Sequence, residues 1–332
     1  SETAFPITQN FAPGFSDPCL PQNLSQGSAN RRANCQADLG ALLTDPQFIA
    51  LPNYSLEILS GSNPNLGEEK SDSYTIGAVI QPRAIPGLAV TVDYFDIKVK
   101  DVITAVSAQG IVNTCYDLPD LNNPFCDLIT RYRGAGTGPN GEVPGQVLDK
   151  DLVVSAVNFA ARTVRGIDST VAYRTTFGAN NALSTRLIYT HTFERSNFED
   201  PTNPDFENRI LEELGDPKDE FRWNLDFEFG KFRMGYEMRY IGPMYLNTYE
   251  DYNSLNGDPP QNDDYADIRK YPETFYHDVS FGYQVNDKFD FTVGVDNILG
   301  TNPPFGLTGI GGGSGIYRIR GTSFYAGVRA GF

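Results

Sequence analysis

The feature that most constrains this chain is a strict alternation of apolar and polar residues in its C-terminal third. Residues 219–229 read DEFRWNLDFEF, with aromatic or aliphatic side chains at every second position and charged or amide side chains between them. Residues 231–240, KFRMGYEMRY, repeat the pattern. Successive side chains of a strand point to opposite faces. Each segment therefore predicts a strand with one apolar and one charged face.

These apolar faces need a cover, because a soluble sheet buries its apolar side against a second layer. The alternation continues through most of residues 219–332, and no helical pattern accompanies it. Hydrocarbon can cover such a face, and transmembrane barrels place apolar side chains outward and polar ones inward. The sequence predicts an all-β, antiparallel transmembrane β-barrel. A soluble two-sheet protein is the rival fold, and it would bury Trp223, Phe227, Met234 and Phe291.

Composition agrees with this prediction and excludes some partners. Mean hydropathy is −0.35, which a barrel allows because every second residue of its strands is polar. No run approaches the roughly 18–20 apolar residues of a spanning helix. The net charge of −16 argues against nucleic acid as a partner, since phosphate binding needs clustered Lys and Arg. The opening SETAFPITQN lacks a signal-peptide pattern, so we expect a mature chain or a part of a longer one.

Strand and turn signals divide the chain into an N-terminal loop region, 1–70, with one short helix near 35–43, and barrel strands over 71–332. Short and long connections alternate, as in outer-membrane barrels. The start of the third strand, at 151–157, is expected to form a hairpin above the membrane. We expect nine strands, at 72–82, 88–101, 151–177, 182–195, 219–229, 231–240, 271–285, 288–298 and 317–332. The long extracellular loops are expected at 102–150, 196–218, 248–270 and 299–316.

Bacterial single-chain barrels have even strand numbers. An open sheet of nine strands would leave two unpaired edges, at a cost of several kcal/mol per exposed backbone group in lipid. The strands therefore indicate the C-terminal part of a larger barrel. The remaining strands would come from the same chain or from another one.

The four cysteines form two local pairs in sequence. Four cysteines allow three connectivities, and sequence proximity favours Cys19–Cys35 and Cys115–Cys126. Disulfides place these segments in an oxidising compartment. A zinc site is the alternative, but it lacks close Cys spacing and a nearby His.

Several stretches resemble the barrel of TonB-dependent outer-membrane receptors. NPNLGEEKSDSYTIG (63–77) followed by GLAVTVDYFDIKVKDVI (87–103) resembles a stretch and strand of that family. VDNIL (295–299) resembles its penultimate strand, and the terminal Phe332 is similar to its C-terminal strand signal. The resemblance implies a barrel of about 22 strands with a plugged lumen, of which these strands would be the last nine. The plug and the TonB-binding box that precedes it in this family are not recognisable in this sequence.

Loop tyrosines are the candidate substrate-binding residues. Their rings would stack on a sugar or on a siderophore ring, or they would pack within the loops. The candidates are Tyr54, Tyr116, Tyr132, Tyr249, Tyr252 and Tyr265.

Catalytic, metal and cofactor sites are not predicted. The two histidines lie on different strands, and Asp278 points away from its neighbour His277 on the opposite face. The Gly-rich stretch 309–315 lacks the Lys-Ser/Thr of a phosphate-binding loop. The acidic loop residues lack the spacing of a calcium-binding loop, so we interpret them as solvated; they are Asp251, Asp258, Asp263, Asp264 and Asp267.

Charged residues in the inward register are interpreted as a substrate path, as a wall on which a plug docks, or as ordinary lumen polarity. They are Arg174, Arg186, Arg222, Asp226, Glu228, Arg233, Glu237, Arg239, Asp278, Asp290, Asp296 and Arg329.

The resulting hypothesis is a segment of a Gram-negative outer-membrane receptor and transporter. The resemblance implies TonB-energised uptake of a bulky nutrient, namely an iron chelate, cobalamin or an oligosaccharide. Its expected partners are outer-membrane lipid, the rest of the barrel and its plug, and the TonB system. Its loops would be extracellular and its C-terminus periplasmic. The alternative is a structural or docking component of an outer-membrane complex without transport.

Overall fold

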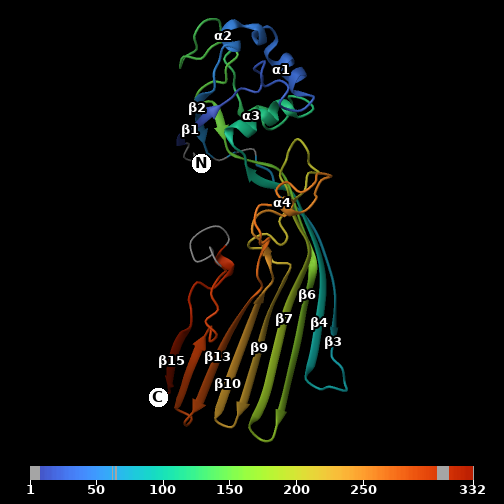
Figure 1. The fold of residues 1–332 in the computed structure, drawn as a ribbon, viewed down its shortest axis with the longest axis vertical. Coiled ribbons are helices and arrows are strands. Elements are labelled where there is room, and N and C mark those ends of the chain that lie inside the picture. The colour runs from blue at the N-terminus through green and yellow to red at the C-terminus, as the bar shows by residue number, and fades with distance from the viewer. Residues whose placement is uncertain (1–7, 62, 64–65, 305–313, 332) are drawn as a thin grey trace, which may run out of the picture. The chain divides into compact units, whose positions relative to one another are not determined.

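The computed structural model describes residues 8–61, 63, 66–304 and 314–331 and divides into two compact units (Figure 1). The N-terminal unit comprises Ser1–Ser71, Val99–Ala161 and Phe198–Phe206. The sheet unit comprises Asp72–Lys98, Arg162–Asn197 and Glu207–Phe332.

Within the described residues, nine strands follow one another in a single sheet in the order of the sequence (Figure 1). This confirms the predicted antiparallel barrel strands, although the sheet is not closed: β3 and β15 form its two edges. The short strand β8 (Asn208–Arg209) pairs with β7. The nine strands are β3 (Lys70–Ile80), β4 (Leu88–Ala105), β6 (Ala156–Phe177), β7 (Asn181–Phe198), β9 (Asp219–Phe229), β10 (Phe232–Ile241), β13 (Thr274–Gln284), β14 (Phe289–Asp296) and β15 (Ser323–Ala330).

The pairing register aligns apolar side chains into rows that run across the strands. One row passes from Leu183 through Phe227, Met234 and Phe281 to Val293. Phe227 is 36% exposed and Met234 40% exposed, and neither belongs to a hydrophobic core cluster of the described residues. The outer row is therefore not buried by protein, which excludes the soluble two-sheet alternative for this unit.

Short turns join the strands at one end of the sheet. Gly230 has a φ of +57° between β9 and β10, and Gly178 has a φ of +65° after β6. Glycine adopts this left-handed region without the steric cost that a Cβ imposes. These tight turns alternate with the long connections, as the sequence predicted.

The last strand is shorter than predicted. It begins at Ser323 instead of residue 317, and Phe332 lies outside the described residues. Tyr317 is instead buried against Ile241, Met244 and Tyr276. This packing removes the start of the alternating segment from the sheet. Most of the Gly-rich stretch 309–315 also lies outside the described residues, which resume at the 3-10 helix η3 (Ser314–Ile316).

The long connections of the sheet unit contain two further short strands. These are β11 (Met244–Tyr245) and β12 (Lys270–Tyr271), which pair with each other. The one-turn helix α4 (Tyr249–Tyr252) lies between them in sequence.

The N-terminal unit is structured where the sequence suggested loops. A three-stranded sheet joins β1 (Thr8–Phe15), β2 (Tyr54–Ser60) and β5 (Leu152–Val154). Because β5 pairs in parallel with β2, the hairpin expected at 151–157 is wrong. The helical elements are α1 (Arg31–Leu39), η1 (Gly40–Thr44), α2 (Pro46–Ile49), α3 (Ala108–Asp117) and η2 (Cys126–Leu128).

Helix α1 and the following 3-10 turn account for the helix predicted near 35–43, which begins earlier than expected. Helix α3 lies in the predicted loop 102–150, capped by the Ser107 hydroxyl that accepts a hydrogen bond from the Gly110 backbone N–H at 3.1 Å. A hydrophobic core unites these elements; its fully buried members include Leu20, Phe48, Leu56, Ile111, Val112 and Leu152.

No helix among the described residues has the length and apolar character needed to cross a bilayer.

Two disulfides fasten the N-terminal unit, with the connectivity that sequence proximity favoured. Cys19 is bonded to Cys35 and Cys115 to Cys126. The first bond ties the segment after β1 to helix α1, and both of its cysteines are fully buried. The second ties α3 to η2.

Replacing Cys19 and Cys35 together by Ala should lower the free energy of unfolding of the N-terminal unit by about 3 kcal/mol, because the unfolded chain regains the closed loop's entropy. Amide hydrogen exchange of α1 measures the loss. The amides of β9 and β10 serve as the internal control and should not change. Unchanged protection in α1 would contradict the prediction.

Candidate ligand-binding surfaces and lumen wall

Two of the candidate tyrosines in the N-terminal unit pack in or against its hydrophobic core, Tyr116 as a buried member and Tyr54 as a half-buried neighbour. Tyr116 is 2% exposed; its hydroxyl donates to Asp38 Oδ2 at 2.6 Å and accepts from Arg131 Nε at 2.6 Å. Burial raises the pKa of Tyr116 above its ordinary value. Tyr54 places its ring edge on Phe15, with centroids 5.4 Å apart, and burial raises its pKa as well. These rings are occupied by packing.

Tyr132 is half-buried in the same unit, and its hydroxyl makes only a long hydrogen bond of 3.4 Å to the Ala135 carbonyl. It is therefore the candidate of the N-terminal unit whose ring is most available to a ligand.

The other three candidates lie in the connection between β10 and β13. Tyr252 is 5% exposed and stacks on Tyr245, with ring centroids 5.5 Å apart. Tyr249 meets Tyr245 edge-on at 5.8 Å, and the Arg209 guanidinium lies 4.7 Å from its ring centroid. Tyr265 is 51% exposed. The six candidates are thus divided between two units. Tyr265 is exposed, Tyr54, Tyr132 and Tyr249 are half-buried, and Tyr116 and Tyr252 are buried.

Beneath the surface of the N-terminal unit lies a buried ion pair that sequence reasoning missed. Arg131 contacts Asp17 through two hydrogen bonds, Nη1 to Oδ2 at 2.6 Å and Nη2 to Oδ1 at 3.0 Å. Both side chains are at most 2% exposed. Burial opposes the guanidinium charge, but the Asp17 carboxylate and Tyr116 outweigh it and raise the pKa of Arg131. No local pattern signals this pair, because its members are 114 residues apart.

A second buried pair joins the ends of two helices. Arg31 Nε lies 2.7 Å from Asp117 Oδ1, and the same carboxylate oxygen accepts from the Ser28 backbone N–H at 3.0 Å. This pair connects the start of α1 to the end of α3.

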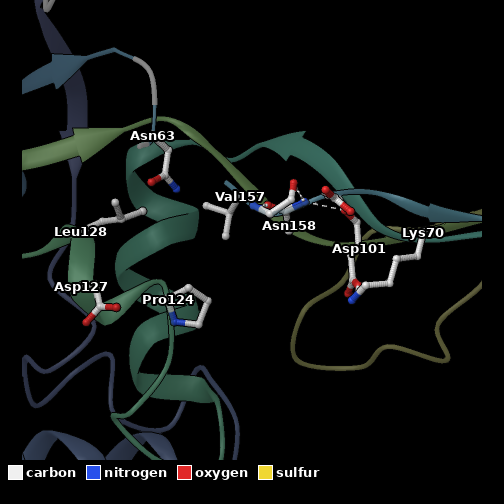
Figure 2. A pocket seen from close by; sticks show the side chains of 10 residues that line it. Asn63, Lys70, Asp101, Pro124, Asp127, Leu128, Val157 and Asn158 are labelled. Atoms are coloured by element: carbon white, nitrogen blue, oxygen red, sulfur yellow. Dashed lines mark hydrogen bonds and ion pairs between the residues drawn. The ribbon is translucent and has the colours of Figure 1, made fainter. Parts of the chain in front are cut away.

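The N-terminal unit also contains a small polar pocket of about 220 Å³, whose lining residues are shown in Figure 2. The Asn158 amide organises it: Oδ1 accepts from the Gly67 N–H at 2.8 Å, and Nδ2 donates to the Asp101 carbonyl at 2.7 Å. Lys70 pairs with the Asp101 carboxylate at 2.9 Å. The pocket is lined by Asn63, Gly67, Glu68, Lys70, Asp101, Pro124, Asp127, Leu128, Val157 and Asn158.

Three carboxylates and one ammonium line this pocket, so it favours a small cationic or hydroxyl-rich group. Its volume lies below the roughly 300–1,000 Å³ of pockets for drug-sized ligands. It is too small to enclose a bulky chelate. Among the described residues, no group of three or more His, Cys, Asp or Glu side chains is arranged to hold a metal ion.

Charged side chains cover the face of the sheet opposite the apolar rows. Arg222 lies 3.8 Å from Glu237 on the neighbouring strand, and Arg233 pairs with Asp290 across two strands. These pairs have the mixed signs expected for the lumen wall. In each pair an arginine and a carboxylate on different strands attract each other, which stabilises the sheet as opposite-charge cross-strand pairs do.

One cation on this wall was not anticipated. Arg318, from the segment before β15, reaches Asp278 at 2.7 Å and Glu237 at 3.6 Å. It lies beside a hollow of about 250 Å³ whose lining includes Asp226 and Asp296. Sequence reasoning missed Arg318 because it assigned residue 318 to the last strand.

The two histidines, His191 and His277, lie on different strands, and His277 does not pair with its sequence neighbour Asp278. His277 Nδ1 lies 2.7 Å from the Tyr236 hydroxyl, while Asp278 faces Arg318. His191 Nδ1 lies 2.6 Å from Asp219 Oδ1, which also accepts from Tyr189.

Comparison with known protein families identifies the family to which the chain is similar. A family model described as TonB dependent receptor-like, beta-barrel matches residues 21–298. No curated protein matches the chain.

Solved structures provide distant similarities. The siderophore receptor PirA from Acinetobacter baumannii is 14% identical with a TM-score of 0.49, over 85% of this chain and 34% of that protein. A variant of the ferric enterobactin receptor PfeA from Pseudomonas aeruginosa is 15% identical with a TM-score of 0.49, over 84% of this chain and 33% of that protein. The copper transporter OprC is 14% identical with a TM-score of 0.43, over 81% and 32%. The chain spans about a third of the length of these proteins.

Proposed function

This chain belongs to the TonB-dependent receptor-like β-barrel family, and from that premise we propose that it serves TonB-energised uptake of a bulky nutrient. Members of the family are outer-membrane transporters and not enzymes. The observation that supports the proposal best is the two-faced sheet, with exposed apolar rows on one side and paired charges on the other. Such a sheet separates hydrocarbon from a polar passage.

The proposed substrate is an iron chelate, cobalamin or an oligosaccharide. The loop segments 1–70, 102–150, 196–218 and 248–270 would capture it outside the cell, and the C-terminus would lie in the periplasm. Tyr132, Tyr249 and Tyr265 are the proposed stacking residues, because they are half-buried or exposed and, unlike Tyr54, do not pack against the core of the N-terminal unit. The polar pocket near Asn158 would contact at most one small group of such a ligand.

The proposed partners include the remainder of a closed barrel. Both edge strands are open, because β3 and β15 each pair with a neighbour on one side only within the described sheet. Unpaired edges are costly in lipid, so we expect additional strands at each edge, from the same chain or another. A plug held against the charged wall would transmit the action of TonB, and outer-membrane lipid would surround the apolar rows.

Uptake assays test this proposal. Cells that lack the gene should lose accumulation of one labelled substrate class among iron chelates, cobalamin and oligosaccharides, and a TonB-deficient strain should lose the same class. Re-expression of the receptor should restore uptake only where TonB is present. Receptor-dependent uptake that persists without TonB would contradict energisation. Unchanged uptake of every class would instead favour a structural or docking role.

A further inference from the structure

Two long connections of the sheet unit contact each other at Glu213. This residue belongs to the connection between β7 and β9, and its Oε1 accepts a hydrogen bond of 2.9 Å from the Tyr249 backbone N–H. Tyr249 belongs to the connection between β10 and β13, where it begins α4. The side chain of the preceding Thr248 makes no such bond. A carboxylate from one connection therefore holds the backbone of the other at one of the proposed stacking residues.

The surroundings of Glu213 are rich in negative charge. Glu250 and Asp251 lie in α4, and Asp216 comes from the same connection as Glu213. Glu250 Oε2 is buried and has no hydrogen-bond partner among the described residues. Asp251 is buried as well and accepts a hydrogen bond from the Asn247 amide. We call Glu213, Asp216, Glu250 and Asp251 the carboxylate cluster.

The cations of the surrounding elements are engaged with other groups. Arg195 of β7 contacts Asp216 at 2.8 Å, and Lys270 of β12 contacts Glu212 at 2.7 Å. The Arg209 guanidinium of β8 lies 4.7 Å from the centroid of a tyrosine ring in α4. Three members of the carboxylate cluster therefore have no ion-pair partner within the described residues, and their charges repel one another.

Protonation of Glu213 relieves this repulsion. Burial raises the pKa of Glu213 above its ordinary value, and the other cluster members raise it further, against the opposing effect of the Tyr249 N–H. The contact between the connections thus binds a proton more tightly than the separated connections do. Its stabilisation by the proton is complete below the ordinary glutamate pKa of about 4.3. That stabilisation is lost as the pH rises through the raised pKa.

The hydrogen bond to Tyr249 does not require the negative charge. A protonated carboxyl group keeps a carbonyl oxygen that accepts hydrogen bonds. A second bond between the same connections, from the Tyr245 N–H to the Glu212 carbonyl at 2.6 Å, joins two backbone groups that do not titrate. The effect of a proton is therefore confined to the part of the contact that holds α4.

We propose that Glu213 is a positioning residue for Tyr249 and acts as a proton-dependent switch. Acidification strengthens the contact of α4 with the connection between β7 and β9, and neutral pH weakens it. A restrained Tyr249 loses less conformational entropy when a ligand ring stacks on it. The inference rests on the proposed function only in assigning ligand stacking to Tyr249.

Amide hydrogen exchange of the full chain, without any substrate, tests the switch. Protection of Tyr249–Tyr252, corrected for the intrinsic exchange rate, should be greater at about pH 5 than at about pH 7.5. The amides of β9 and β10 serve as the internal control and should be equally protected at both pH values. Glu213→Gln keeps the acceptor but removes the charge. It should raise protection at neutral pH to the acidic level of the wild type and abolish the pH dependence.

Glu212→Gln is the matched control, because it makes the same chemical change at the adjacent residue. Glu212 is paired with Lys270, so its neutralisation removes an attraction instead of a repulsion. This variant should lower the protection of α4 and keep the pH dependence. Glu213→Ala removes the acceptor together with the charge and should lower the protection of α4 at both pH values.

Two results would overturn the proposal. The first is equal protection of α4 in the wild type at the two pH values, and the second is a pH dependence that Glu213→Gln leaves intact. Because the measurement contains no substrate, its result is independent of the uptake assays. A failure of TonB-energised uptake and a failure of the switch are therefore distinguishable.

Discussion

Replacing Arg131 by Ala should lower the free energy of unfolding of the N-terminal unit by about 3–5 kcal/mol, the cost of removing one partner from a buried ion pair. Asp17 is fully buried and would keep a carboxylate without its guanidinium. The Tyr116 hydroxyl would lose its donor at the same time. Hydrogen exchange of the amides in α1 and α3 measures the change.

Arg133→Ala is the matched control. Arg133 also pairs with a carboxylate, that of Asp38, but its side chain is 53% exposed. Exposed pairs contribute about 0–1 kcal/mol, so this variant should change protection only slightly. Replacing Arg131 by Met together with Asp17 by Leu should recover much of the loss, because apolar replacement of a buried pair is often neutral. Equal effects of the two Arg→Ala substitutions would refute the assigned role of burial.

Leu225→Arg should destabilise the membrane-inserted sheet by about 2–4 kcal/mol, the cost of a cation on the lipid face near the bilayer midplane. Leu225 lies in the apolar register of β9, opposite Tyr236 of β10 and Thr185 of β7. The added guanidinium would face hydrocarbon. Urea unfolding in lipid vesicles, followed by the fluorescence of Trp223, measures the loss.

Asn224→Arg places the same side chain one residue earlier and on the opposite face. There the guanidinium would lie opposite Glu237 on β10 and opposite Arg186 on β7. Attraction to one and repulsion from the other largely cancel on a water-screened face, so we expect a change below about 1 kcal/mol. The comparison depends only on which face meets lipid. Similar losses for both variants would remove the basis for the transmembrane orientation.

The sheet could be predicted because its pattern is local. In β9 and β10 every second residue is apolar, so side-chain direction follows from sequence spacing alone. The positions of the turns followed from Gly and Asn-Asp signals at 230 and 286–287. The prediction from alternation was wrong at residue 317. Tyr317 is buried in a small hydrophobic core instead of continuing the last strand.

The N-terminal unit could not be predicted in the same way. Its strand β5 is three residues long, and β2 and β5 are distant in sequence. Its core and ion pairs arise from contacts between segments that local periodicity does not relate. The sequence also could not separate buried from exposed tyrosines, because a tyrosine combines an apolar ring with a polar tip and suits either place. Tyr116 and Tyr265 illustrate the two outcomes.

The fastening of the N-terminal unit has a consequence for affinity. Two buried ion pairs join segments that are far apart in the chain, and two disulfides close shorter loops within the same unit. A ligand that binds this unit does not have to order long stretches of backbone. The loss of conformational entropy on binding is therefore smaller, and more of the interaction energy contributes to affinity. Specificity among similar ligands can then depend on the side chains at the surface, because the backbone beneath them keeps the same conformation for each ligand.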